Sequence, residues 1–146
     1  MPGITRAHRI ALVALALGTA AACGDDAAGP DDPGAGLATI RLTIGGMTVN
    51  LTAGGAGAAV DIPQGNTPVS AVFLDAGGGE VALDVAEFEL RIVSSNTTRL
   101  RFVRLGAFTG TLEASELGTI ALQVSLFHLD DDHADFGPQN LTVTVQ

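Results

Sequence analysis

The sequence predicts an all-β protein, with about eight short antiparallel strands arranged as a sandwich or a barrel. Two observations predict this fold class. From Ala38 onward, apolar and polar residues alternate with a period of two, and Gly-rich or polar segments separate the alternating runs at even spacing. Regular short strands of this kind indicate sheets with one buried and one solvated face. Residues 38–146 suit one sandwich domain, which takes roughly 100 residues.

The first predicted strands form a hairpin followed by a buried strand. Residues 38–44 place Ile, Leu and Ile on one face and Thr, Arg and Thr on the other. The Gly pair at 45–46 is typical of a tight hairpin turn, and residues 47–52 then alternate in the same way. Residues 69–74 are apolar enough for a buried strand, and the Gly-rich segment 75–79 ends it.

The second half of the domain supplies the remaining strands. Each of its alternating runs puts apolar side chains on one face, and the runs lie at residues 87–92, 99–103, 106–114, 118–129 and 140–146. The last run has Leu and Val facing inward and Thr facing outward, which favours a strand at the end of the domain.

The N-terminus has the pattern of a bacterial export signal. Arg6 and Arg9 form a basic segment, and residues 10–17 form an apolar stretch that is too short to span a bilayer. Small residues then lead to Cys23, and "AAAC" at 20–23 resembles a lipobox with Ala where Leu is usual. The resemblance implies a signal peptide at 1–22 and a lipid anchor on Cys23. An ordinary secretory signal followed by an incidental cysteine is the alternative.

Residues 23–37 are predicted to be the lipidated Cys and a flexible acidic tether. The segment consists of Gly, Ala, Pro and Asp with almost nothing to bury, so it cannot form a core. Its Asp pairs are typical of a solvated spacer rather than of a metal site. A chain of this length reaches at most roughly 45–50 Å, so the domain at 38–146 can stand away from the membrane.

Composition excludes some partners. The net charge is −9, with seven basic residues against sixteen acidic ones. Nucleic acid needs a basic surface, and electrostatic docking on anionic lipid does too, so neither is expected. The single cysteine rules out a disulfide within the chain.

Four segments spread over 38–146 share the features of one domain family: "VSAVFLDAGGGEV", "FELRIVSSN", "GAFTGTLEASELGTIALQVSL" and the terminal "LTVTV". With these segments the domain resembles a bacterial immunoglobulin-like (Big) domain. The chain departs from the family in lacking a Trp on the central strand, where Leu90 or Ile92 stands, and in carrying "HLDDDHADF" before the last strand. The resemblance implies an immunoglobulin-like β-sandwich of about seven to eight strands. It also implies an extracytoplasmic structural or adhesive module without catalytic residues.

The segment "HLDDDHADF" at 128–136 is the part of the sequence with metal-binding chemistry. Two imidazoles with carboxylates suit Zn²⁺ or Cu²⁺. The carboxylates alone would suit Ca²⁺, which is the less favoured ion because "DDDHAD" does not fit the calcium-loop pattern D-x-D-x-D-G. The spacing of the two His residues fits no standard zinc motif, and an acidic surface loop is the alternative. The candidate ligands are His128, Asp130, Asp132, His133 and Asp135.

Two functions follow from these observations. The first is a membrane-anchored envelope lipoprotein, in the periplasm or at the cell surface, whose single domain binds an envelope protein or polysaccharide or has a structural role. The second is a periplasmic protein that binds a divalent metal through the loop at 128–135. No nucleophile or metalloprotease motif is present, so an enzyme is not expected.

Overall fold

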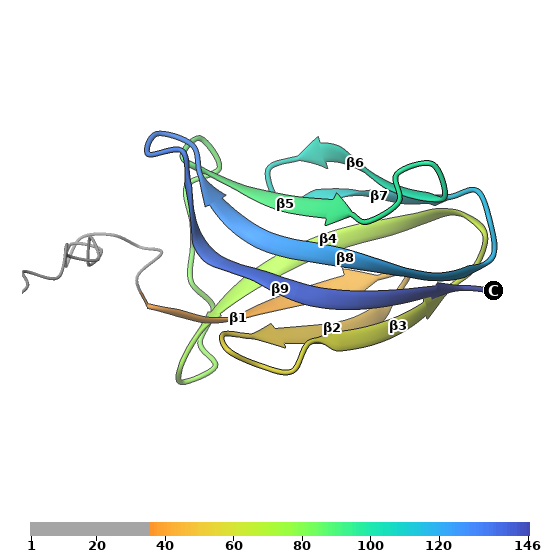
Figure 1. Cartoon of the computed structure of the whole chain (residues 1–146). Coiled ribbons are helices and arrows are strands. Elements are labelled where there is room, and N and C mark those ends of the chain that lie inside the picture. Colours follow the sequence, from red (N-terminus) through yellow and green to blue (C-terminus); the bar gives the residue numbers. More distant parts are fainter. Residues whose placement is uncertain (1–35) are drawn as a thin grey trace, which may run out of the picture.

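The computed structural model describes residues 36–146, which form nine strands. Figure 1 shows these strands in two layers. The predicted signal peptide, Cys23 and almost all of the predicted tether lie outside the described residues. Residues 36–146 contain no helix, and hence none long and apolar enough to cross a membrane. The strands are β1 (Leu37–Ile44), β2 (Met47–Thr52), β3 (Ala58–Ile62), β4 (Gly65–Asp75), β5 (Phe88–Ser94), β6 (Leu100–Gly106), β7 (Thr109–Ala114), β8 (Gly118–His128) and β9 (His133–Val145).

The strands form two sheets that pack face to face, which confirms the predicted β-sandwich. One sheet has five strands in the order β2-β1-β4-β7-β6, and the other has four in the order β3-β9-β8-β5. Neighbouring strands are antiparallel, except that β3 runs parallel to β9.

The core lies between the two sheets and follows the alternation in the sequence. Ile40, Leu42 and Ile44 of β1 are fully buried, and Leu122 and Leu126 of β8 are buried against them from the other sheet. Burying one such side chain contributes about 1.5–3 kcal/mol. Thr and charged residues occupy the alternate positions on the outer faces, as a period of two requires.

The strand β3 was not among the predicted elements. Its sequence, "AAVDI", has only two large apolar residues, Val60 and Ile62, and follows a Gly-rich turn. Both are buried, because β3 pairs with β9 at the edge of the four-stranded sheet. The alternation was too short and its Ala residues too small to stand out from the turn before it, so the domain has nine strands where about seven to eight were expected.

Charged side chains link β5 and β6, the edge strands of the two sheets. Glu89 of β5 is only 8% exposed. Its carboxylate pairs with Nε of Arg91 at 2.7 Å and with Nη1 of Arg104 on β6. The guanidinium of Arg91 also lies 3.0 Å from the centre of the Phe127 ring. Because a buried carboxylate is costly without such partners, the two arginines make this burial possible and connect the two layers.

The predicted loop at 128–135 is a β-hairpin with a turn of four residues. His128 ends β8, residues 129–132 turn, and His133 begins β9. The pairing of β8 with β9 shifts register between Val124 and Leu126 and again between Leu126 and Phe127. Such shifts are β-bulges, which add a residue to one strand and rotate the side chains that follow.

Strand direction gives the sandwich two different ends. The start of β1, the end of β4, the start of β5 and the β8–β9 turn lie together at one end, called here the hairpin end (Figure 1). The β5–β6 and β7–β8 connections lie at the opposite end, called here the far end. The described chain starts at the hairpin end, and its C-terminus lies at the far end.

Candidate metal centre

Three of the predicted ligands lie together at the hairpin end. His128, His133 and Asp135 each offer one ligand atom, and these atoms lie within 4.8 Å of one another. Two imidazole nitrogens and a carboxylate oxygen are a ligand set typical of zinc and of other divalent transition metals. The geometry therefore selects three of the five predicted residues.

The hairpin explains how residues five positions apart come together. His128 and His133 are direct partners across the β8–β9 pair, and directly opposed side chains lie about 4.5–5.5 Å apart at Cβ. Their ring centres are 5.8 Å apart. The spacing of the two His residues fits no standard zinc motif, but the four-residue turn places them opposite each other on neighbouring strands.

Asp135 reaches the two imidazoles because of a bulge. Leu126 pairs with Phe136 and Phe127 pairs with Ala134, so Asp135 is the extra residue on β9. The Asp135 side chain is 3% exposed, and the next residue, Phe136, is 4% exposed. Two consecutive buried side chains are incompatible with a regular strand, in which neighbours point to opposite faces, and the bulge removes that restriction.

The Asp135 carboxylate lies between the two rings. Its Oδ1 is 2.6 Å from Nε2 of His133, and its Oδ2 is 3.7 Å from Nδ1 of His128. The side chain of His128 is 15% exposed, whereas that of His133 is 53% exposed. The site therefore has a buried carboxylate at its base, one nearly buried imidazole and one imidazole at the surface through which an ion can enter.

The ring of His128 is held in place by packing. It stacks on the ring of Phe88, with centres 4.6 Å apart and planes 20° apart, and Phe88 itself is fully buried. The turn beside it is tied to the preceding loop, because the backbone N–H of Leu129 donates to the carbonyl oxygen of Glu87 at 2.7 Å. A ligand that is already oriented loses less conformational entropy when it binds an ion.

The candidate ligand atoms can surround one metal ion if their side chains move slightly. Ligand atoms about 2.0–2.1 Å from a tetrahedral ion lie about 3.3 Å from one another. The 2.6 Å and 3.7 Å separations around Asp135 bracket that value, and the largest separation, up to 4.8 Å, exceeds it. Because His133 is half exposed, rotation of its side chain can close the difference at little cost.

The other predicted ligands lie elsewhere. Asp130 and Asp132 are exposed on the turn and are not part of the three-residue group. Sequence reasoning passed over Asp131, whose Oδ2 lies 3.2 Å from Nδ1 of His128. The signal that points to it is spacing, because Asp131 follows His128 by three residues within the same turn.

The hairpin end attracts cations. The connections at 76–87 and 129–132 carry Glu80, Asp84, Glu87 and three consecutive Asp residues, with no Arg or Lys. A local excess of negative charge raises the concentration of cations near the surface. This electrostatic environment favours a divalent ion at the His and Asp cluster.

No protein-family model matches the chain, and a search of curated proteins finds no similar sequence. The resemblance to a bacterial immunoglobulin-like domain therefore stays a prediction, and the function has to be inferred from the site.

Proposed function

We propose that the chain is a lipid-tethered β-sandwich of the bacterial cell envelope that binds one divalent transition metal ion at His128, His133 and Asp135. The observation that carries the proposal is the convergence of two imidazoles and a buried carboxylate within 4.8 Å on one hairpin. Zn²⁺ and Cu²⁺ are the ions that this ligand set suits, because Ca²⁺ takes six to eight oxygen ligands.

Three protein ligands leave a coordination position open. Structural zinc sites are closed by four protein ligands, whereas an open site keeps a position for water or another ligand. The exposure of His133 adds a route for exchange. This arrangement suits capture and release of an ion by a protein in the envelope, with Cys23 as its membrane anchor.

Calorimetric titration tests metal binding. The full chain carrying Cys23→Ser is titrated with Zn²⁺, Cu²⁺ and Ca²⁺ at pH 7.5. The expected result is one equivalent of Zn²⁺ or Cu²⁺ bound with a Kd on the order of micromolar, about −8 kcal/mol, and no comparable heat from Ca²⁺.

The matched controls separate the cluster from the acidic turn. His128→Ala combined with His133→Ala should abolish the heat, whereas Asp130→Ala combined with Asp132→Ala should leave it within about threefold, since exposed charges contribute little. Equal heats from the two double variants would contradict the proposed site.

The lipid anchor has a separate test. Cys23→Ser should release the chain into the soluble fraction of the cells, because the acyl chains that hold it in the membrane are lost. A variant that still sediments with membranes at high salt is not anchored through Cys23, whatever its affinity for metal.

A further inference from the structure

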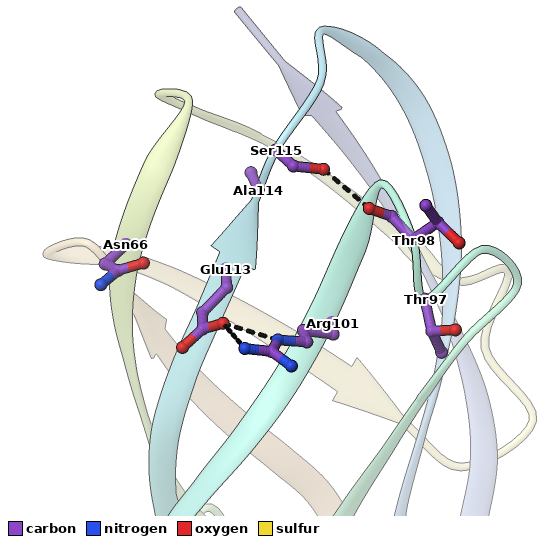
Figure 2. A pocket seen from close by; sticks show the side chains of 7 residues that line it. All are labelled: Asn66, Thr97, Thr98, Arg101, Glu113, Ala114 and Ser115. Carbon is purple, nitrogen blue, oxygen red and sulfur yellow. Dashed lines mark hydrogen bonds and ion pairs between the residues drawn. The ribbon is translucent and has the colours of Figure 1, made fainter.

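A cavity lies at the far end of the sandwich, away from the proposed metal centre. It is an open cavity of about 480 Å³ on the outer side of the five-stranded sheet (Figure 2). Its lining is polar, and the residues that matter for its chemistry are Asn66, Thr97, Thr98, Arg101, Glu113 and Ser115. Cavities of this volume are large enough for a small-molecule ligand.

A row of planar polar groups forms the floor of the cavity. Asn66 of β4 pairs in register with Glu113 of β7, which pairs with Arg101 of β6, so the three lie side by side across adjacent strands. Nε and Nη2 of Arg101 both lie 2.6 Å from Oε2 of Glu113. This ion pair uses one carboxylate oxygen, and within residues 36–146 Oε1 of Glu113 and Nη1 of Arg101 keep their hydrogen-bonding capacity.

The wall of the cavity is the β5–β6 turn, and hydrogen bonds hold it to Ser115, the residue that follows β7. The hydroxyl of Ser115 donates to the carbonyl oxygen of Thr98 at 2.7 Å, the contact drawn in Figure 2. The backbone N–H of Ser115 donates to the carbonyl oxygen of Arg99 at 2.9 Å. Thr97 and Thr98 are exposed on this turn. The cavity is therefore formed before a ligand arrives, which lowers the entropy lost on binding.

The charges of the lining select the class of ligand. Arg101 and Glu113 neutralise each other, so neither an anion nor a cation gains a net attraction. The polar lining also disfavours an apolar ligand such as a lipid chain. What remains is a neutral ligand that offers donors and acceptors close together. Adjacent hydroxyl groups are such a set, because each hydroxyl both donates and accepts a hydrogen bond. They match the guanidinium, amide and carboxylate groups of the floor.

We infer that the far-end cavity binds a neutral saccharide through the row of Asn66, Glu113 and Arg101 and the hydroxyls of the β5–β6 turn. None of the lining residues is aromatic, so ring stacking adds nothing. A few hydrogen bonds, each with a modest net contribution, give a Kd on the order of millimolar. This inference is independent of the metal centre, which lies at the opposite end.

The test is a titration followed by ¹H–¹⁵N correlation spectra. The full chain carrying Cys23→Ser, kept in EDTA to hold the metal centre empty, is titrated with maltotriose, cellotriose and N-acetylated chitotriose to 30 mM. We expect at least one trisaccharide to shift the amide signals of Thr97, Thr98 and Ser115 and the Nε–H signal of Arg101. The signals of the β8–β9 hairpin should stay in place.

Two variants of the same residue type decide between the cavity and a general surface effect. Asn66→Ala removes one planar group of the floor and should weaken binding at least fivefold. Asn50→Ala on β2 removes an exposed Asn of the same sheet outside the cavity, and binding should stay within twofold. Three outcomes would overturn the inference: no shift with any of the sugars, equal effects of the two variants, or shifts at the cavity with inorganic phosphate instead of sugar.

Discussion

The two ends of the sandwich differ in charge although the same strands run through both. The connections 76–87 and 129–132 at the hairpin end carry six acidic residues and no basic one. The connections 95–99 and 115–117 at the far end carry one Arg and one Glu, and Arg99 pairs with Glu116 at 3.1 Å. One end is built to attract cations, and the other has no net charge.

The difference shows which parts of the chain determine chemistry. The inward faces of the strands make one core, which holds both ends rigid. The connections and the residues beside the bulges differ between the ends, and they carry the candidate sites. Function in such a domain therefore depends on connections positioned by the sheets and not on the sandwich itself.

The largest expected effect is a loss of stability when a core residue at either end of the sandwich is truncated. Phe88→Ala and Leu100→Ala each remove a fully buried side chain and should lower the free energy of unfolding by about 3–5 and 2–5 kcal/mol respectively, measured by urea denaturation. Only Phe88→Ala should also weaken Zn²⁺ binding, by about tenfold, because His128 loses the ring on which it stacks. Equal Zn²⁺ affinities of the two variants would show that this packing does not position the ligand.

The next effect concerns Gly137, which lies on β9 in the bulge opposite Val124 and Leu126. Gly137 has a φ of 95°, and an added Cβ would lie 2.7 Å from the carbonyl oxygen of Val124. Gly137→Ala should therefore lower the free energy of unfolding by about 1–3 kcal/mol. The control is Gly36→Ala, at a position with no atom within 4 Å of the added Cβ, which should be neutral. A neutral Gly137→Ala would mean that the backbone of β9 relaxes easily next to the candidate metal ligands.

A smaller loss of stability is expected when either of two carboxylates that pair with Arg is neutralised. Glu89 is buried and contacts two Arg side chains, whereas the Arg101–Glu113 pair is more exposed. Glu89→Gln should lower the free energy of unfolding by about 1–3 kcal/mol, and Glu113→Gln by no more than about 1 kcal/mol. Denaturation in 0.1 M and 1 M salt provides the check, because the loss at Glu113 should shrink with salt more than the loss at Glu89.

The smallest effect concerns the turn of the hairpin. Asp131 lies 3.2 Å from Nδ1 of His128, whereas Asp130 belongs to no group around the imidazoles. Asp131→Asn should weaken Zn²⁺ binding by about threefold to fivefold, since a nearby exposed charge contributes up to about 1 kcal/mol. Asp130→Asn removes the same charge one position away, and titration should show a change of less than twofold.

The period-two alternation was sufficient to predict the fold class. It also extends to the end of β8, because steps of two from Ile120 lead to the buried Leu126 and then to His128, whose side chain is 15% exposed. The exception is β3, whose two large residues were too few to show a pattern.

The details of the site could not be predicted, because they depend on bulges. Simple alternation cannot place both Asp135 and Phe136 inside, and the bulge opposite Leu126 and Phe127 does. No local sequence pattern predicts that extra residue. The cavity at the far end could not be predicted either. Its floor comes from three strands that become neighbours only through the strand order of the sheet, and its residues are Asn66, Glu113 and Arg101.

X-ray absorption at the zinc edge tests the central claim most directly. The full chain carrying Cys23→Ser, loaded with one equivalent of Zn²⁺, should show two imidazole nitrogens at about 2.0–2.1 Å and carboxylate oxygen at about 2.0–2.2 Å. The imidazole signal should disappear when His128→Ala and His133→Ala are combined. A shell of oxygen atoms alone, or an unchanged spectrum in the double variant, would contradict a metal centre on this hairpin.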